Sequence, residues 1–280
     1  MEVITTKHEI RRLVWDARCG GRRVGVVPTM GALHEGHLSL VQASAAACDM
    51  TIVTIFVNPT QFGPHEDFAK YPRDLAADVA QLVPHKVDAL FAPPLDEIYR
   101  PGHSTFVDPP AVAEPLEGAF RPTHFRGVAT IVLKLFQLIP ADVAFFGQKD
   151  YQQSLVIRHM VEQLDLSIAI QVCPTIREPD GLALSSRNVY LNTAERQQAL
   201  ALYRALRKCV EQYRQGCSRV AELQGNMHSL LLEAGIAGID YAVVVDRNSL
   251  QPIDSANDDS VALIAARVGK TRLIDNLLFS

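Results

Sequence analysis

The chain has 280 residues, of which 48% are apolar and 21% are charged, and its formal net charge is -4. This composition is typical of a globular protein with one large domain or two smaller ones. The mild negative charge argues against DNA or RNA as the main partner, because proteins that bind these polyanions usually carry a strongly basic face. No apolar stretch approaches the ~18 residues of a membrane-spanning helix, so we expect no membrane association.

The N-terminal segment and the cysteines both bear on the cellular location. Residues 1–13 lack the charged start followed by an apolar run that is typical of a signal peptide. The five cysteines include no C-x-x-C pair, and an odd number makes a poor disulfide framework. We therefore expect free thiols and a cytoplasmic location, where thiols stay reduced.

Short β-rich runs alternate with helical patterns along the first part of the chain. The runs are apolar on both faces, which is typical of strands covered by helices on both sides. The alternation predicts an α/β fold with a Rossmann-like, doubly wound parallel sheet. The expected strands are 24–27, 51–57, 89–92, 143–146 and 168–173, and the expected helices are 39–47, 75–83, 128–138 and 152–164.

The pattern changes beyond the fifth predicted strand. Two long helices are expected at about 193–213 and 218–234, followed by strands at 240–245, 260–266 and 271–274. Thr193 is the expected cap of the first of these helices. Helices followed by strands predict a separate, smaller α+β domain. The boundary is expected between Pro174 and Ser185, which gives domains of residues 1–176 and 177–280.

The most informative segment is VGVVPTMGALHEGHLSLV, from Val24 to Val41. A predicted strand ends, glycines turn the chain, and a helix begins near Gly36. Ligands of α/β sheets bind beyond the carboxyl ends of the strands, and a helix N-terminus offers phosphate free N–H groups and partial positive charge. Gly31 and Gly36 lack the side chains that would block a close approach.

His34 and His37 are three residues apart, so both are expected on one side of the first helical turn. Two imidazoles there can donate hydrogen bonds to a phosphate and stabilise the charge that develops during its displacement. A bare H-x-x-H more often consists of ordinary surface or core polar groups, and a zinc site would lack a third ligand at a helpful spacing. The preceding strand and glycine turn favour phosphate binding.

Two amides follow the second predicted strand. Asn58 and Gln61 lie just past its end, and neutral amides orient polar substrates through both donors and acceptors. Asn58 before Pro59 also fits ordinary turn chemistry, whereas a turn does not require Gln61. The segment therefore predicts a substrate contact at Gln61 more strongly than at Asn58.

The segment FFGQKDYQQ, from Phe145 to Gln153, again joins an apolar strand, a glycine and a helix. Lys149 lies in the loop, where its charge can meet a phosphate. Asp150 can either cap the helix or approach a metal-bound nucleotide. Gln153 lies one helical turn after Lys149 and can face the same cleft.

The segment LSSRN, from Leu184 to Asn188, lies at the predicted domain boundary. Two hydroxyls and a guanidinium in succession can surround a triphosphate. Alone, such a segment also fits an ordinary linker. Its position favours binding, because clefts between domains are common ligand sites.

Together these segments resemble the pantoate–β-alanine ligases, a family of the nucleotidylyltransferase superfamily. The resemblance covers essentially the whole chain and rests on PTMGALHEGH at 28–37, IFVNPTQFGP at 55–64, RPTHFRGVATIVLKLF at 121–136, FFGQKDYQQ at 145–153, LSSRN at 184–188 and GKTRLIDN at 269–276. Three departures are His65 in place of asparagine, Gln148 in place of glutamate, and residues 98–101 in place of Met-Tyr-Pro. Gln148 removes a negative charge beside Lys149.

The resemblance implies an ATP-dependent condensation of pantoate with β-alanine to pantothenate, within coenzyme A biosynthesis. The implied route passes through a pantoyl adenylate and releases pyrophosphate and AMP. It further implies Mg2+ held mainly by the ATP phosphates, with no metal ligands from the protein, and a homodimer built through the N-terminal domain. The second domain is an expected lid, because water destroys an acyl adenylate.

The resemblance also assigns roles to residues. His37 is the implied catalytic acid, and His34, Lys149 and Arg187 join it in supplying positive charge. Gln61 and Gln153 are expected to hold pantoate, with Gln61 also near β-alanine, and Asn58 and Met30 complete the expected substrate contacts. The expected ATP site comprises Met30, Gly31, Ala32, Leu33, His34, Glu35, Gly36, His37, Gly147, Gln148, Lys149, Asp150, Ile176, Leu184, Ser185, Ser186 and Arg187.

The residues alone leave three other functions open, and they indicate only a small, partly apolar hydroxy acid as substrate. A nucleotidyl transferase that stops at a stable product would use the histidine loop equally, although the pair Gln61 and Gln153 and the SSRN segment favour a ligase. A regulatory module that binds ATP without turnover would not need the full set of His, Lys and Arg. A tRNA-charging relative would need a basic face or an anticodon-type domain.

Overall fold

The computed structural model describes residues 1–64, 66 and 68–280, so the departure at His65 lies outside the described residues. The chain forms two compact units. The N-terminal unit comprises Met1–Gly147 and Gln152–Pro174, and the C-terminal unit comprises Gln148–Tyr151 and Thr175–Ser280. The expected division into a binding domain of 1–176 and a lid domain of 177–280 stays a prediction.

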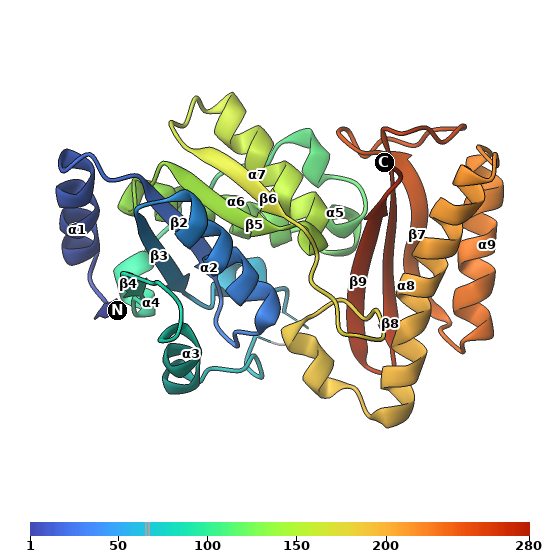
Figure 1. The fold of residues 1–280 in the computed structure, drawn as a ribbon, viewed down its shortest axis with the longest axis horizontal. Coiled ribbons are helices and arrows are strands. Elements are labelled where there is room, and N and C mark those ends of the chain that lie inside the picture. Colours follow the sequence, from blue (N-terminus) through green and yellow to red (C-terminus); the bar gives the residue numbers. More distant parts are fainter. Residues whose placement is uncertain (65, 67) are drawn as a thin grey trace. The chain divides into compact units, whose positions relative to one another are not determined.

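A six-stranded parallel sheet with the order β1-β4-β3-β2-β5-β6 forms the centre of the N-terminal unit (Figure 1). Its strands are β1 (Glu2–Ile4), β2 (Val24–Thr29), β3 (Met50–Ile55), β4 (Ala89–Phe91), β5 (Val143–Gly147) and β6 (Ala169–Cys173). From β2 the chain proceeds to β3 and β4 on one side and later to β5 and β6 on the other. Such a switch point is where doubly wound sheets bind ligands.

Helices cover this sheet, and the predicted Rossmann-like α/β fold is confirmed. The helices are α1 (Lys7–Cys19), α2 (Glu35–Ala47), α3 (Leu75–Leu82), α4 (Leu95–Ile98), α5 (Glu117–Phe120), α6 (His124–Leu138) and α7 (Tyr151–Gln163), and the 3-10 helices are η1 (Pro59–Gln61), η2 (Ala111–Ala113) and η3 (Gln148–Asp150). Helix α2 packs against β2, β3 and β5. The apolar runs are buried on both faces for this reason.

Two predictions at the N-terminal end were incomplete. The short strand β1 and the helix α1 were not expected, although Thr6 caps α1 by accepting a hydrogen bond from the Glu9 N–H group. The strand β2 also continues through Pro28, where the prediction ended it. Proline has no backbone N–H group, so it fits a strand only where that donor has no partner. The pairing of β2 with β5 involves only Gly25 and Val26, so no donor toward β5 is required at position 28.

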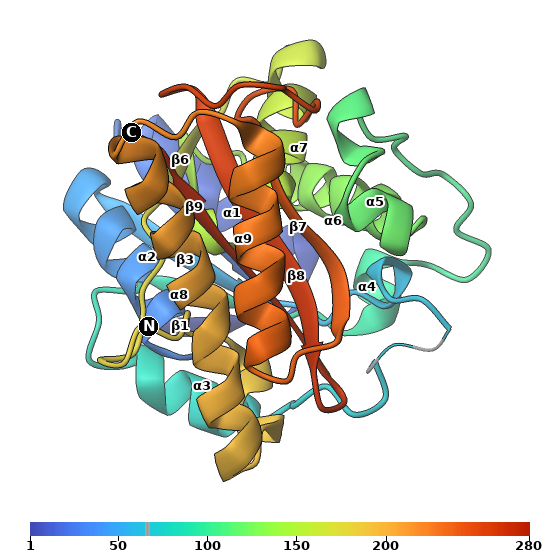
Figure 2. The ribbon, with the colours of Figure 1, turned by 90° about the vertical axis from the view of Figure 1, so that its right-hand side faces the viewer.

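The C-terminal unit is an antiparallel sheet with the order β7-β8-β9, and two helices lie on it (Figure 2). Helix α8 (Thr193–Arg214) packs on β8 (Ser260–Val268) and β9 (Thr271–Leu278), and helix α9 (Val220–Glu233) packs on β7 (Gly238–Asp246). The predicted smaller α+β arrangement is therefore confirmed.

The caps of these two helices differ from the prediction. Asn192, not Thr193, caps α8: its side chain accepts from the Glu195 N–H group, and the Glu195 carboxylate accepts from the Asn192 N–H group, both at 2.9 Å. This reciprocal capping box satisfies two otherwise unpaired donors. Helix α9 begins at Val220 rather than at Ser218. All five cysteines are free, and among the described residues no helix is long and apolar enough to cross a bilayer.

Candidate active site

The loop after β2 brings the two histidines together at the start of α2. His34 is the N-cap of α2, and its Nδ1 accepts a hydrogen bond from the Gly36 N–H group at 3.2 Å. The centroids of the His34 and His37 rings are 4.1 Å apart. Because Nδ1 accepts this bond, a neutral His34 carries its proton on Nε2.

Asp78 holds the backbone of this histidine loop. It lies in α3, is buried, and accepts hydrogen bonds from the N–H groups of Ala32 at 3.1 Å and Leu33 at 2.8 Å. Gly31 has a φ of +80°, and a Cβ atom there would lie 2.8 Å from the carboxylate. A glycine is therefore required at position 31 both by the left-handed backbone and by the carboxylate behind it. Sequence reasoning missed Asp78, because it is 45 residues from Leu33.

The amides predicted for the substrate form a buried cluster with Met30. Asn58 donates from Nδ2 to Gln61 Oε1 at 3.0 Å, and Gln61 donates from Nε2 to Met30 Sδ at 3.0 Å. Asn58 is itself fixed, since Nδ2 also donates to Gly127 O at 3.1 Å and Oδ1 accepts from the Tyr99 hydroxyl at 3.0 Å. Asn58 therefore orients the side chain of Gln61.

Helix α6 approaches this cluster closely at Gly127. A Cβ atom at this position would lie 2.4 Å from the carbonyl oxygen of Thr60, which belongs to η1. A larger residue would displace η1 and with it Gln61. Sequence reasoning missed this role, although a glycine within an apolar helical pattern is a signal of close packing.

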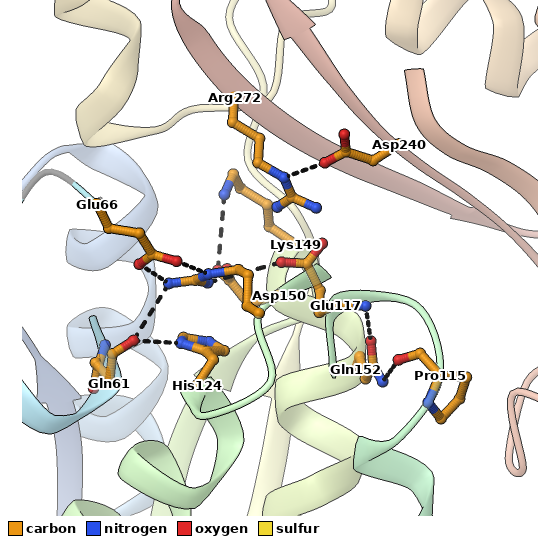
Figure 3. Close-up of polar contacts among 11 residues, drawn as sticks. Gln61, Glu66, Pro115, Glu117, His124, Lys149, Asp150, Gln152, Asp240 and Arg272 are labelled. Carbon is orange, nitrogen blue, oxygen red and sulfur yellow. Dashed lines mark hydrogen bonds and ion pairs between the residues drawn. The ribbon is translucent and has the colours of Figure 1, made fainter. Parts of the chain in front are cut away.

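Polar side chains also hold the backbone of Gln61 (Figure 3). His124, the first residue of α6, donates from Nδ1 to Gln61 O at 2.9 Å, because a carbonyl oxygen can only accept. Burial, and then the charge of Arg121, lower the pKa of His124 to about 4. Arg121 makes two hydrogen bonds of 2.7 Å to the carboxylate of Glu66. Gln61 thus lies beside a neutral imidazole and an Arg–Glu pair.

The adjacent glutamines of α7 have different environments. Gln152 is buried, accepts from the Glu117 N–H group at 3.0 Å and donates to Pro115 O at 2.7 Å (Figure 3). It also donates to Val112 O at 2.9 Å. Gln152 therefore fixes the segment around η2 and α5. Gln153, which was predicted to contact the substrate, is half-buried.

Lys149 belongs to the C-terminal unit rather than to the sheet that precedes it. It lies in η3, its side chain is 19% exposed, and Nζ is 3.8 Å from Asp150 Oδ2 (Figure 3). Asn276 of β9 donates to Gln148 O and to Lys149 O, both at 2.9 Å. Gln148 donates in return from Nε2 to Asn276 Oδ1 at 3.3 Å, a bond that a glutamate at position 148 could not donate.

Part of the LSSRN segment is helical, because residues Ser186–Tyr190 form the 3-10 helix η4. Ser185 caps it, with Oγ accepting from the Arg187 N–H group at 3.2 Å, which is the usual role of serine before a helix. Leu184 donates from its N–H group to Ile176 O at 3.0 Å. The structure therefore brings together Ile176 and the 184–187 segment, which were both expected at the ATP site.

The described side chains include the donor types that bind metal ions. Across residues 1–64, 66 and 68–280, no group of three or more His, Cys, Asp or Glu side chains could hold a metal ion. The predicted site residues Met30–His37, Asn58, Gln61, Gly147 and Gln153 lie in the N-terminal unit. Those at 148–150, 176 and 184–187 lie in the C-terminal unit.

Comparison with known proteins decides the family. A family model described as pantoate-beta-alanine ligase matches residues 2–278. The chain belongs to the pantoate-β-alanine ligase family. Members of this family are enzymes, and this ligase is 53% identical over 255 residues to a pantothenate synthetase of Roseiflexus castenholzii, with 91% of this chain and 92% of the relative covered. It is 50% identical over 279 residues to one of Rhodopirellula baltica, with 99% and 98% covered.

Solved structures support the same assignment. The crystal structure of pantothenate synthetase from Thermus thermophilus matches this ligase with a TM-score of 0.94 at 43% identity, covering 100% of this chain and 99% of the other. A pantoate-beta-alanine ligase from Francisella tularensis, complexed with beta-gamma ATP and beta-alanine, matches with a TM-score of 0.80 at 36% identity, covering 100% and 98%. The ligase therefore shares its fold along the whole chain with these relatives.

Proposed function

We propose that the protein condenses pantoate with β-alanine to form pantothenate, with ATP as the energy source. The observation that carries this proposal is the histidine pair at the start of α2. The same loop begins with Met30, which contacts the buried amides of Asn58 and Gln61. The histidines supply donors suited to phosphate, and the amides suit a hydroxy acid. The Francisella relative with bound ATP and β-alanine supports both ligands.

In the first proposed step, the carboxylate of pantoate attacks the α-phosphate of ATP and pyrophosphate leaves. The attack joins two anions, so the site needs positive charge and positioning rather than a strong base. We assign this charge to His34, His37, Lys149 and Arg187, with His37 as the acid. ATP is expected to carry Mg2+ on its own phosphates, as the resemblance to the family implies.

In the second proposed step, the amine of β-alanine attacks the acyl carbon of the adenylate and AMP leaves. Gln61 and Gln153 are assigned to pantoate, and Gln61 also to β-alanine. Its backbone is held by His124 and its side chain by Asn58, so its orientation is set before the substrates bind. The mixed anhydride needs protection from water, and we assign the C-terminal unit as its lid.

A cytoplasmic location and a homodimeric state are part of the same proposal. The location is supported by the five free cysteines, and the dimer rests on the resemblance to the family. Sedimentation of the purified chain is expected to give the mass of a dimer.

The proposed reaction is tested by isotope exchange between pyrophosphate and ATP, with Mg2+ and a panel of small carboxylic acids but without amine. Exchange that requires pantoate supports the adenylate step, and AMP release on addition of β-alanine supports the second step. Exchange with a different acid keeps the mechanism and overturns the substrate. If no acid supports exchange, and pantoate with β-alanine releases no AMP, the proposed function is wrong.

The roles of His37 and Lys149 can be measured in the same assay. We expect His37→Ala and Lys149→Ala each to lower the exchange rate at saturating ATP by about 10²–10³-fold, as for other groups that stabilise transition-state charge. His8→Ala and Lys86→Ala are matched controls, because both side chains are exposed, and we expect them to keep wild-type rates. Wild-type exchange in either site variant would remove that residue from the mechanism.

A further inference from the structure

The side chain of Asn276 is devoted to the loop that carries Lys149. Asn276 is 1% exposed, and Nδ2 donates to the carbonyl oxygens of two consecutive residues, Gln148 and Lys149, at 2.9 Å each. Its Oδ1 accepts from Gln148 Nε2 at 3.3 Å. One buried amide therefore holds two neighbouring peptide groups of η3 from a strand 128 residues later in the chain. The family motif GKTRLIDN contains this residue, and the assigned chemistry does not use it.

Arg177 fixes Asn276 from the other side. Its guanidinium makes two hydrogen bonds to the carboxylate of Asp275, at 2.6 and 2.8 Å, and donates to Asn276 O at 3.3 Å. The guanidinium also lies over the ring of Tyr203, 3.8 Å from its centroid. Bidentate, buried contacts of this kind fix geometry as well as charge. The backbone of Asn276 is therefore held while its amide holds η3.

The same arginine belongs to the hairpin that carries two other residues of the expected ATP site. Arg177 pairs with Ala183 in an isolated β-bridge, and Leu184 donates to Ile176 O at 3.0 Å. The dipeptide Asp275–Asn276 therefore connects the Lys149 loop to the hairpin at 176–184, all within the C-terminal unit.

We propose that Asn276 is a positioning residue for Lys149: its amide fixes the peptide groups of Gln148 and Lys149, and the Arg177–Asp275 pair fixes Asn276. The inference rests on the proposed role of Lys149 in adenylation. Without the two carbonyl contacts, η3 loses its anchor on β9 and the ammonium group of Lys149 takes up several positions. A displacement of about 1 Å of a catalytic group can cost on the order of 10²-fold in rate.

The first test compares Asn276→Ala with a control, Ser260→Ala, in the pyrophosphate exchange assay. We expect Asn276→Ala to lower the maximal exchange rate by about 10–100-fold. Ser260→Ala removes a buried hydroxyl that accepts from the Asn257 N–H group in the same unit, and the wild-type rate is expected.

A double-mutant cycle separates positioning of Lys149 from a general structural role. If Asn276 acts through Lys149, adding Asn276→Ala to Lys149→Ala lowers the rate by less than about 2-fold further. An equal loss in both backgrounds overturns the proposal. Arg177→Lys provides a second route should Asn276→Ala fold poorly: it keeps a charge beside Asp275 but loses the planar fork, and we expect a smaller rate loss with the same dependence on Lys149.

Hydrogen exchange of the peptide 145–153 supplies a readout that is independent of catalysis. Asn276→Ala is expected to raise exchange in this peptide, and Ser260→Ala is not. Wild-type exchange of pyrophosphate in Lys149→Ala would remove the assigned role of Lys149 and the inference with it. If Lys149→Ala is slow but Asn276→Ala has the normal rate and unchanged hydrogen exchange, the inference is wrong and the role of Lys149 stands.

Discussion

His124 donates its Nδ1 proton to the carbonyl oxygen of Gln61 from a buried position at the first residue of α6. Burial disfavours the imidazolium form, and Arg121 adds repulsion, so the pKa falls to about 4. The positive end of a helix acts in the same direction. The ring is therefore neutral near neutral pH, and the bond that holds Gln61 does not change with pH in that range.

This pKa predicts how stability depends on pH. In the unfolded chain His124 has its ordinary pKa of about 6.5, so between that value and about 4 the unfolded state binds more protons, and stability falls as the pH falls. From pH 7 to pH 5 this histidine is expected to remove about 2 kcal/mol of the free energy of unfolding. His124→Asn keeps a donor for Gln61 O without titrating.

Denaturant unfolding at pH 7 and pH 5 measures the effect in wild type and in His124→Asn. The variant is expected to lose less stability than wild type over this interval, by about 2 kcal/mol. His8→Asn, at an exposed position of α1, is the matched control and is expected to follow wild type. An identical pH dependence in wild type and His124→Asn would contradict the assignment of a neutral His124.

Strand β9 carries the residue that holds the loop of Lys149. It pairs with β8 along its whole length, and Asp275 and Asn276 in its second half are both buried polar residues. Burial raises the pKa of the Asp275 carboxyl, and the Arg177 guanidinium opposes that rise. A buried carboxylate requires such a partner, because an unpaired charge away from water is strongly unfavourable.

The pair therefore predicts a large effect from removing one partner. Arg177→Met leaves Asp275 buried without its counter-ion, and we expect the free energy of unfolding of the C-terminal unit to fall by about 3–5 kcal/mol. Arg207→Met is the matched control, because Arg207 pairs with Glu211 on the exposed face of α8, and such pairs contribute about 0.2–1 kcal/mol. Chemical denaturation of both variants measures the difference, and equal losses would show that the buried pair is not a special contact.

At the scale of the molecule, the two units have separate hydrophobic cores. One cluster contains Val27, Val53 and Leu90 of the parallel sheet. The other contains Leu202 and Leu206 of α8, with residues of α9 and of the antiparallel sheet. Residues Gln148–Tyr151 group with the second unit although they follow β5 directly in the chain. Lys149 is thus attached to the unit that also carries Ser185 to Arg187.

This division predicts which segments exchange hydrogen faster when a buried side chain is removed from each core. Leu206→Ala and Leu90→Ala remove fully buried side chains, and each is expected to cost about 2–5 kcal/mol. In native-state hydrogen exchange, Leu206→Ala is expected to raise exchange in residues 175–280 and in 148–151, and Leu90→Ala in the remainder of the chain. A response of 148–151 to Leu90→Ala alone would place Lys149 with the parallel sheet instead.

Much of the fold and part of the candidate site follow from local patterns in the sequence. Runs such as Thr51–Val57 are apolar on both faces, and this alone indicates strands covered on both sides. Gly31, His34 and His37 lie within seven residues of one another, so a strand end and a helix start were enough to predict where they lie. Periodicity, caps and turn residues act over a few positions, and the sequence displays them directly.

The tertiary structure alone decided how those local segments are held. Asp78 is 45 residues from the loop that it supports, and Asn276 is 128 residues from Gln148. Nothing near Gln152 and Gln153 in the sequence distinguishes the glutamine that fixes a loop from the one proposed to contact substrate. The attachment of Lys149 to the C-terminal unit has the same origin. Contacts between distant segments depend on how the elements pack, and the period of a single element carries no information about them.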